Sequence, residues 1–184
     1  MTNAKKRLRS EGREQTYRNA RRLGWLFSAL VTLFALSVVF LIWLLPTRIV
    51  DVSMSPALES GEVVLCDRLA KYVSEPERGD IILFQTPDGV FIKRIVGLPG
   101  ESVELVDGHV FIDSRPLDES AYVDVYAGDM APVVVPEGSV FVLGDNREQM
   151  YDSRLESVGC IAFEDIQGVL RVRVSPIEKL TFFS

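Results

Sequence analysis

The chain has 184 residues, of which 47% are hydrophobic, and a formal net charge of −6. The charge is divided unevenly: residues 1–22 carry eight Lys or Arg against two Glu, net +6, whereas residues 23–184 carry twelve Lys or Arg against 24 Asp or Glu, net −12. This split indicates two environments, and the basic end is too short and mixed for a nucleic-acid-binding module, so no nucleic-acid partner is expected.

The first predicted element is a long apolar helix at residues 23–45, which contain no Asp, Glu, Lys or Arg. At about 1.5 Å per residue this segment would extend about 34 Å, enough to cross the hydrocarbon core of a bilayer. Trp25 and Trp43 lie near its two ends, where aromatic residues commonly anchor a helix at the membrane interface. We therefore expect a transmembrane anchor at 23–45, with the lipid bilayer as its partner.

The flanks of this anchor predict its orientation. Eight Lys or Arg precede it, and Arg48 is the only one among the roughly 20 residues that follow. The positive-inside rule then predicts a basic cytoplasmic tail at 1–22 and an extracytoplasmic domain at 46–184, in a single-pass protein of the cell membrane. A cleaved signal peptide is the alternative, but its apolar core is usually about 7–15 residues long, and no small-x-small site follows this run.

Beyond the anchor, short apolar runs alternate with turn signals. Pro87–Gly89 and Asp107–Gly108 each separate two such runs, which is typical of a β-hairpin. Residues 107–138 are expected to form a small cap or insert, within which 114–137, rich in Pro, Asp and Gly, should have little regular structure. The expected fold class is mostly β, an antiparallel β-sheet domain behind one N-terminal transmembrane helix. Strands are predicted at 62–65, 80–85, 90–96, 102–106, 109–113, 139–143 and 168–174, and helical turns at 69–73 and 163–166.

Ser53 lies shortly after the anchor, in a stretch, 49–58, that is expected to be extended. Pro56 fixes its own φ and pushes Ser55 toward extended geometry, so this stretch should be rigid. A rigid serine at a membrane surface is a candidate nucleophile, although most serines in loops only cap or solvate the backbone. A serine hydroxyl also needs a base to take its proton.

The candidate bases are few. His109 is the only histidine, and its place after the Asp107–Gly108 turn is that of an exposed residue, so a Ser-His-Asp triad is not expected. Lys93 differs from Lys71 and Lys179 because it stands inside the apolar run 90–96. Burial disfavours an ammonium ion and lowers its pKa, which is what would let this lysine act as a base. The alternative is a lysine on an edge strand whose amine reaches water and discourages aggregation.

Metals and cofactors have no evident ligands in this sequence. One histidine and two cysteines are too few for the usual zinc ligand sets, and no Gly-rich phosphate-binding loop precedes a helix, so neither a metal nor a cofactor is expected. Cys66 and Cys160 form a disulfide in an oxidising compartment or are two small buried residues, and the sequence leaves both alternatives open.

Four stretches of the sequence carry a family resemblance. Ser53–Pro56 reads Ser-Met-Ser-Pro, Arg78–Phe84 begins Arg-Gly-Asp, and Lys93–Glu101 reads Lys-Arg-Ile-Val-Gly-Leu-Pro-Gly-Glu. Gly144–Arg147 is followed by Asp152–Arg154, Asp-Ser-Arg. In this order, behind an N-terminal anchor, they resemble type I signal peptidases, membrane-bound Ser-Lys proteases that remove signal peptides from exported proteins. The resemblance covers residues 23 to about 174, and the gap of 40 positions between serine and lysine is similar to that of the compact, Gram-positive-like members with one anchor.

The resemblance implies a role for each matching residue. Ser53 would be the nucleophile, Lys93 its general base, and the backbone N–H of Ser53 a donor to the oxyanion. The substrate would be the signal peptide of a pre-protein, an extended segment ending in small-x-small that adds to a strand edge. Several charged residues would support the site, and the alternative for each of them is ordinary surface ion pairing, worth about 0–1 kcal/mol. The residues expected to support the site are Met54, Pro56, Arg94, Asp145, Asn146, Arg147, Asp152, Ser153 and Arg154.

Three positions depart from the family pattern. Asp51 stands where a small residue is usual, and on an extended stretch its carboxylate would oppose the developing oxyanion or pair with Lys93 and hold it protonated. Ala57 replaces a common threonine. Met150 falls where the family has a serine that hydrogen-bonds the lysine amine, a role that Tyr151 or Ser153 would have to take over.

Two hypotheses of different classes follow from these residues. The first is an active, membrane-anchored serine endopeptidase that removes signal peptides with a Ser53–Lys93 dyad. The second is a catalytically weak relative that acts as a binding or assembly factor for exported or surface-polymerised proteins. Asp51 and Met150 motivate the second hypothesis.

Overall fold

The computed structural model describes residues 2–183 of the chain. Position 1 of the predicted basic tail lies outside the described residues, as do the side chains of 1–18, 20, 41 and 42. The chain divides into two units, residues 1–42 and 43–184. Each is described here by itself.

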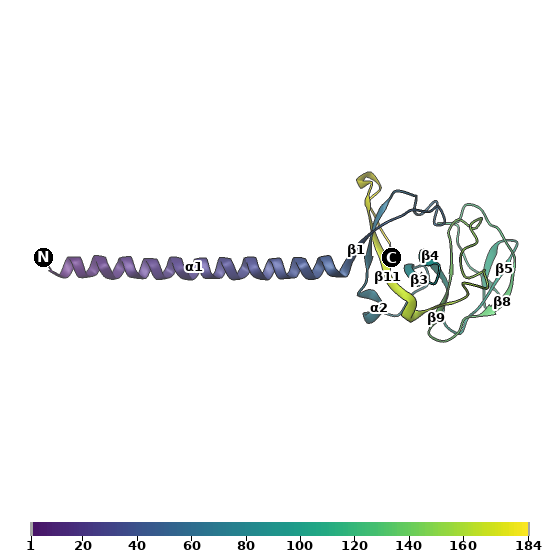
Figure 1. The fold of residues 1–184 in the computed structure, drawn as a ribbon, viewed down its shortest axis with the longest axis horizontal. Helices are drawn as coiled ribbons and strands as arrows, with labels where there is room; N and C mark the ends of the chain where they lie inside the picture. The colour runs from purple at the N-terminus through teal and green to yellow at the C-terminus, as the bar shows by residue number, and fades with distance from the viewer. Residues whose placement is uncertain (1, 184) are drawn as a thin grey trace. The chain divides into compact units, whose positions relative to one another are not determined.

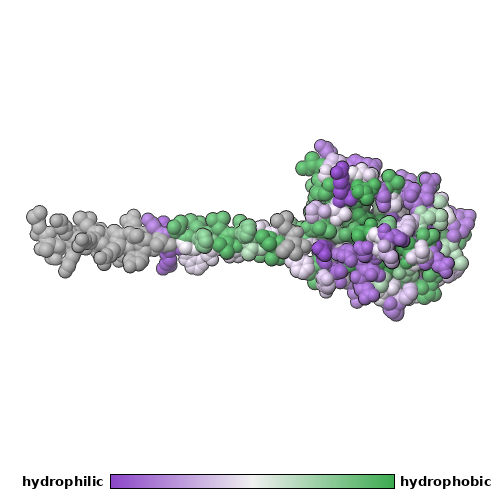
Figure 2. Space-filling model, in the orientation of Figure 1, coloured by the Kyte–Doolittle hydropathy of each residue, from purple (hydrophilic) through white to green (hydrophobic). Residues whose placement is uncertain are grey.

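The first unit is formed by the helix α1 (Thr2–Trp43). It contains a 20-residue segment, Arg21–Phe40, with a mean hydropathy of 2.2, in which no residue is buried. This segment is long and apolar enough to cross a membrane. Figure 2 shows the hydrophobic residues that follow one another along this segment. The helix ends at Trp43, two residues before the end of the apolar run, because Leu44 and Leu45 begin the first strand.

The second unit is built from two antiparallel sheets (Figure 1). The larger has the order β1-β2-β11-β3-β4-β9-β10, with β12 added to β11, and the smaller has the order β7-β6-β5-β8. Antiparallel sheets behind one N-terminal apolar helix confirm the predicted fold class. The strands are β1 (Leu44–Arg48), β2 (Val63–Asp67), β3 (Ile81–Thr86), β4 (Gly89–Gly97), β5 (Ser102–Val106), β6 (His109–Ile112), β7 (Arg115–Pro116), β8 (Met130–Val134), β9 (Ser139–Leu143), β10 (Ile161–Ala162), β11 (Ile166–Ser175) and β12 (Thr181–Phe182). The short helices are α2 (Ala70–Val73), η1 (Phe163–Asp165) and η2 (Ile177–Lys179).

Both predicted hairpins are present. β3 and β4 pair from Thr86↔Gly89 onward, and β5 and β6 pair from Val106↔His109. The second turn needs left-handed backbone at both central residues, which Asp107 (φ 50°) and Gly108 (φ 78°) adopt. The turn signals in the sequence therefore predicted both the hairpin that contains Lys93 and a hairpin of the small sheet.

The prediction of little regular structure at 114–137 holds for 117–129 but misses two strands. β7 and β8 lie in this stretch, and β8 pairs with β5 at the edge of the small sheet. Four of its five residues are exposed, so β8 lacks the alternation of buried and exposed positions that marks a strand in sequence. Pro132 is compatible with such an edge position because one side of the strand needs no hydrogen-bond donor.

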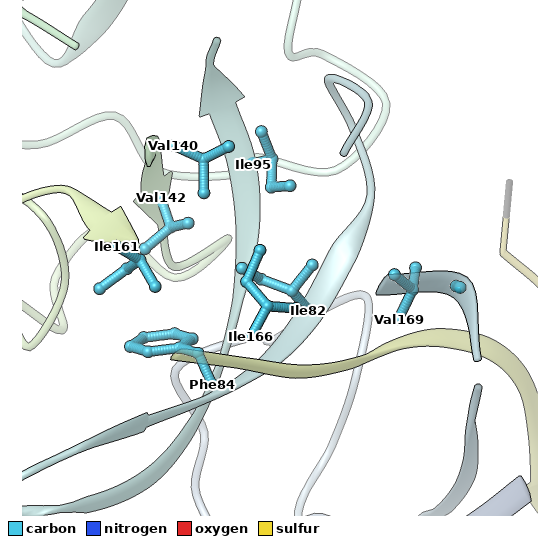
Figure 3. Close-up of a cluster of buried hydrophobic side chains, with 9 residues drawn as sticks. Ile82, Phe84, Ile95, Val140, Val142, Ile161, Ile166 and Val169 are labelled. Atoms are coloured by element: carbon cyan, nitrogen blue, oxygen red, sulfur yellow. The ribbon is translucent and has the colours of Figure 1, made fainter. Parts of the chain in front are cut away.

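Buried side chains form three clusters in the second unit. The first, shown in part in Figure 3, joins β3, β4, β9 and β11, and Phe84 lies within it, fully buried. The second packs beneath residues 49–58 and includes Met54 and Leu58. The third holds the two sheets together through Phe141 of β9 and Val103 of β5. A methyl group on Gly97 would lie 2.5 Å from Val103 Cγ2, so the sheets approach too closely there for a side chain.

Candidate active site

Ser53 lies in the loop between β1 and β2. The loop is closed by hydrogen bonds between the backbones of Ile49 and Glu62, 2.9 Å, and of Gly61 and Ile49, 2.8 Å. Met54 and Leu58 are buried beneath it, at 1% and 0% exposure. These contacts confirm a fixed loop, but the prediction of an extended stretch at 49–58 is wrong. Residues 51–57 turn, because the apolar side chains after the serine must point into the core.

Lys93 lies in the middle of β4, with β3 on one side and β9 beginning to pair at the next residue, Arg94. Its side chain is buried, with 1% of the residue exposed, so the alternative of an edge-strand lysine that reaches water is wrong. Its Nζ lies 2.6 Å from Ser53 Oγ. Burial is the main influence on the amine and lowers the pKa of Lys93 below the usual 10.5.

Asp51 binds Ser53 instead of Lys93. Its Oδ1 accepts a hydrogen bond from the Ser53 hydroxyl at 2.9 Å and another from the Ser53 backbone N–H at 3.1 Å. The second bond is a side-chain-to-backbone contact two residues on, the usual one for aspartate at a turn. No carboxylate oxygen among the described residues lies within 4.0 Å of Lys93 Nζ, so the predicted ion pair of Lys93 with Asp51 is wrong.

The loop after β9 contacts the backbone around the serine. Asn146 donates its N–H to Ser53 O at 3.1 Å and its side-chain amide to Val52 O at 3.2 Å. At Gly144 a methyl group would lie 2.6 Å from Ser53 O. Glycine is therefore required at 144 by the close approach of two backbones.

Arg94 and Asp145 join this loop to β4. The Arg94 guanidinium donates two hydrogen bonds to the Asp145 carboxylate, at 2.8 and 2.7 Å, and a third to Gly79 O at 2.9 Å. The other face of the guanidinium lies 4.2 Å from the ring centroid of Tyr122. Burial raises the pKa of Asp145, and the bonds from Arg94 oppose that rise.

Arg147 is buried against an acidic residue that the sequence gave no reason to choose. Its guanidinium pairs with the Glu119 carboxylate, through Nη1 at 3.1 Å and through Nη2, and its Nε donates to Gly144 O at 2.9 Å. Both side chains of the ion pair are 0% exposed. Glu119 lies in the stretch predicted to be surface loop, and only the rule that a buried guanidinium needs a carboxylate would have called for such a partner.

Asp152 and Arg154 complete the bracing of the loop. Asp152 accepts the Gly144 N–H at 3.2 Å and pairs with Arg154 at 2.8 Å, and Arg154 also donates to Arg147 O at 2.9 Å. The side chains of Asp152 and Arg154 are 0% and 3% exposed, so ordinary surface ion pairing does not describe them. Ser153 Oγ accepts the backbone N–H of Val142 at 2.9 Å, which fixes the loop to β9.

Neither Tyr151 nor Ser153, the expected replacements for the missing serine, forms a hydrogen bond with Lys93 in the described structure, and Ser153 bonds Val142 instead. Met150 is 55% exposed. Tyr151 donates its hydroxyl to Asp88 at 2.6 Å and stacks on Phe91, with the ring centroids 4.2 Å apart. The Phe91 ring in turn lies 6.0 Å from Lys93 Nζ, so an aromatic ring stands between Tyr151 and the surroundings of the amine.

The remaining candidate residues form no hydrogen bond with Ser53 or Lys93 in the part of the chain that the structure describes. His109 begins β6, is exposed and stacks on Tyr126 at 4.2 Å between ring centroids. Cys66 and Cys160 are both free thiols, and burial raises the pKa of Cys66 to about 12. Pro56, of the nucleophile motif, follows Ser55 through a cis peptide bond.

A cavity is lined by residues that precede and follow Ser53 in the chain, although Ser53 itself does not line it. It has a volume of about 190 Å³ and lies between the residues around Ile49 and the first half of β4. That half of β4 has no strand on its β9 side, because β9 pairs only from Arg94 onward. The cavity is lined by Thr47, Arg48, Ile49, Val50, Asp51, Met54, Leu83, Val90 and Ile92.

Known proteins place this chain in a family. The family model described as signal peptidase, peptidase S26, matches residues 22–175. Among curated relatives, the probable signal peptidase I-2 of Synechocystis sp. is 34% identical over 136 residues, which are 70% of this chain and 62% of that protein. Thylakoidal processing peptidase 1 of Arabidopsis thaliana is 34% identical over 149 residues, 74% of this chain and 43% of that protein. Signal peptidase I S of Bacillus subtilis is 32% identical over 139 residues, 70% of this chain and 75% of that protein.

The chain therefore belongs to the signal peptidase family, peptidase S26. It spans 62% and 43% of the lengths of the first two of these relatives. A crystal structure of a signal peptidase I from Enterococcus faecalis is 37% identical in sequence and covers 53% of this chain and 97% of its own, with a TM-score of 0.46.

Proposed function

We propose that this protein is a membrane-anchored serine endopeptidase that removes N-terminal signal peptides from exported pre-proteins. The observation that carries the proposal is the 2.6 Å contact between Ser53 Oγ and a lysine amine that is almost fully buried. Burial lowers the pKa of the Lys93 amine, so it becomes neutral at a lower pH than a free amine does, and only a neutral amine accepts a proton. Relatives named signal peptidase I support the substrate class.

In this mechanism Ser53 is the nucleophile and Lys93 the general base. As Oγ attacks the scissile carbonyl carbon, its proton passes to Nζ, and the carbonyl oxygen becomes an oxyanion. The backbone N–H of Ser53 donates to that oxyanion. The C–N bond then breaks, Nζ returns the proton to the leaving amine, and a water activated by the same amine hydrolyses the acyl-enzyme.

The charged residues after β9 hold the serine against the lysine. Asn146 and Gly144 contact the backbone of Ser53 and Val52, and the pair of Arg94 and Asp145 ties their loop to the residue after Lys93. Side chains locked by several hydrogen bonds are what keeps a nucleophile within reach of its base. In this proposal these residues, with Arg147, Asp152, Ser153 and Arg154, are positioning residues.

The substrate is a signal peptide that ends in small-x-small. An extended peptide can add to the unpaired first half of β4, where main-chain hydrogen bonds give affinity and alternate side chains enter pockets. The cavity of about 190 Å³ that Asp51 and Met54 help to line limits the size of a side chain that enters it. Its mostly apolar lining suits alanine better than a charged residue.

The apolar segment of α1 anchors the enzyme in the cell membrane. The basic residues before it lie in the cytoplasm and residues 46–184 lie on the other side, as the positive-inside rule requires. Protease treatment of intact and permeabilised spheroplasts tests this orientation. Digestion of the second unit in intact spheroplasts supports it, and protection until permeabilisation contradicts it.

The catalytic proposal is tested by cleavage of a pre-protein with an Ala-x-Ala site in liposomes. Ser53→Ala and Lys93→Met are each expected to lower kcat/KM by about a thousandfold, because nucleophile and base are lost. Ser60→Ala and Lys71→Met are the matched controls. Ser60 lies in the same loop but donates to Val50 O, and Lys71 donates to Ile166 O and has no hydrogen bond to Ser53. Cleavage by Ser53→Ala or Lys93→Met at the wild-type rate would show that another mechanism operates.

A second candidate function is favoured by one observation. The carboxylate of Asp51 accepts hydrogen bonds from both the hydroxyl and the backbone N–H of Ser53. This arrangement is compatible with a catalytically weak binding or assembly factor for exported proteins, which does not need a reactive serine. Such a factor binds signal peptides without turnover. Turnover of the pre-protein by the wild-type chain at an ordinary rate, about 1 per second or faster, rules it out.

A further inference from the structure

Ser53 has two hydrogen-bonding groups that matter for acyl transfer, and one carboxylate oxygen holds both. Asp51 Oδ1 accepts the hydroxyl hydrogen at 2.9 Å and the backbone N–H at 3.1 Å. The hydroxyl has a single hydrogen, so while that hydrogen points to Asp51 it cannot point to Lys93. Lys93 Nζ accordingly stands as donor to Ser53 Oγ at 2.6 Å.

This arrangement is the reverse of the one that the reaction needs. For Lys93 to act as base, the hydroxyl hydrogen must lie between Ser53 Oγ and a lone pair of Nζ. For the oxyanion to be stabilised, the Ser53 N–H must point at the substrate oxygen. A carboxylate in that position also opposes a developing negative charge.

Asp51 is placed to leave when a substrate arrives. Ser53 and Lys93 are buried, at 6% and 1% exposure, whereas Asp51 is exposed and lines the cavity of about 190 Å³. A peptide that enters this cavity therefore meets Asp51, whose carboxylate can move into water. Water compensates a displaced carboxylate far better than it compensates a displaced buried group.

We propose that Asp51 holds the nucleophile in a resting arrangement, and that the carbonyl group of a bound peptide must displace its carboxylate before the Ser53 proton can pass to Lys93. This inference rests on the proposed function, because it assigns the order of events at the same serine. In the displaced state the N–H of Ser53 donates to the substrate carbonyl, and the hydroxyl hydrogen turns to Nζ. No bond other than hydrogen bonds is made or broken in this step.

The charges around Lys93 give the inference a second consequence. The carboxylates of Asp51, Asp152 and Asp145 favour the ammonium form, while Arg154 and, above all, burial oppose it. Asp51 is the largest of the acidic influences and the exposed one, so its removal changes the amine with the least damage to the fold. The pKa of Lys93 falls without it, and cleavage, which requires the neutral amine, then sets in at a lower pH.

The test compares Asp51→Ala and Asp51→Asn in the full chain in liposomes. Asp51→Ala is expected to raise kcat/KM for an Ala-x-Ala pre-protein about tenfold, because a hydrogen bond to a charged acceptor no longer has to be broken. Asp51→Asn keeps an acceptor oxygen without the charge, so it should gain less in rate. In both variants the pH at which kcat/KM reaches half its maximum moves down. Asp124→Ala and Asp124→Asn, at an exposed aspartate of the same unit, control for net charge and should match the wild type.

A second measurement, the affinity for a peptide aldehyde, tests the inference without requiring cleavage. A peptide aldehyde ending in Ala-x-Ala adds Ser53 Oγ to its carbonyl carbon, and the oxygen that results needs the Ser53 N–H as donor. Asp51→Ala is expected to bind this aldehyde about tenfold more tightly than the wild type, with Ser53→Ala as the negative control.

The outcomes separate this inference from the proposed function. Equal aldehyde affinity and an unchanged pH midpoint in Asp51→Ala and wild type overturn the role of Asp51, whatever the cleavage rates. Tighter aldehyde binding by Asp51→Ala when no variant cleaves any pre-protein upholds the role of Asp51 and overturns the proposed function. If Asp51→Ala melts at a lower temperature than the wild type, the same comparisons are made with Asp51→Asn.

Discussion

Lys93 on β4 and Arg147 in the loop after β9 are buried to the same extent, with 1% of each residue exposed, but their surroundings differ. Arg147 is paired with Glu119 and donates to Gly144 O. Lys93 contacts a serine hydroxyl, and no carboxylate of the described residues lies within 4.0 Å of its amine. A guanidinium stays charged and must be paired when buried, whereas an amine can lose its proton. The difference separates a cation that braces a loop from one suited to proton transfer.

The largest effect is expected from breaking the buried ion pair. Glu119→Gln leaves the Arg147 guanidinium buried and uncompensated, so the free energy of unfolding should fall by about 3–5 kcal/mol. Urea unfolding measures it, with Glu137→Gln, at an exposed glutamate, as control. A loss no larger than that of the control would show that Arg147 does not depend on its partner.

Substitution of Arg94 tests whether the geometry of its hydrogen bonds, in addition to its charge, contributes to the free energy of unfolding. Arg94→Lys keeps the positive charge but cannot form both bonds to Asp145 and the bond to Gly79 O, so we expect a loss of about 2 kcal/mol in unfolding free energy. Arg78→Lys is the matched control, because Arg78 pairs with Glu101 at a more exposed site. Equal losses in the two variants would mean that the forked contact to Asp145 adds nothing.

Lys93→Met should abolish cleavage yet stabilise the fold at neutral pH, by about 1 kcal/mol or more, because a desolvated amine is replaced by an apolar side chain of similar length. Burial lowers the pKa of Lys93 in the folded state below the usual 10.5, so the unfolded chain binds more protons between the lowered value and 10.5. Wild-type stability therefore rises with pH across that window. The advantage of Lys93→Met is full below the window and smallest above pH 10.5. Thermal unfolding at several pH values measures it, and an advantage that does not change with pH would count against a perturbed amine.

The smallest effect is expected at an exposed cation. Lys179 contacts Glu59, whose side chain is 54% exposed, and the buried Glu62, which keeps Arg173 as a second partner. The Lys179 side chain is itself 46% exposed. Lys179→Ala should leave the urea midpoint within the error of measurement and the cleavage rate unchanged. A clear drop in the midpoint would mean that surface pairs contribute to stability as the buried ones do.

The sequence predicted that Ser53 and Lys93 lie together, and it predicted the ion pairs around them only in part. Ser53 and Lys93 are recognisable because each has an unusual local setting, a serine beside an anchor and a lysine inside an apolar strand, and the structure brings them together. Glu119 could not be foreseen, because its burial depends on Arg147, 28 positions away in the chain. Pattern alone cannot pair residues across that separation when one lies in an irregular loop.

Two misjudged stretches show where local pattern gives no information. β8 is an exposed edge strand, so its sequence carries no alternation, and only its pairing with β5 makes it a strand. The loop at 51–57 was expected to be extended from the preference imposed by Pro56, but the burial of Met54 and Leu58 outweighs that preference. Asp51 was expected near the serine for the wrong geometric reason, and it reaches Ser53 through a turn.

The close approach at Gly144 has a consequence for how the sequence of this protein can vary. The serine is located by main-chain atoms, the Ser53 carbonyl against Gly144 and the Asn146 amide, so its position does not depend on which side chains line the neighbouring cavity. Residues such as Val50, Val90 and Ile92 are then open to exchange without disturbing the reacting atoms. Under the proposed function, a library of variants at these three positions should change which signal peptides are cleaved while retaining turnover. Adding Gly144→Ala should abolish turnover in every variant of that library.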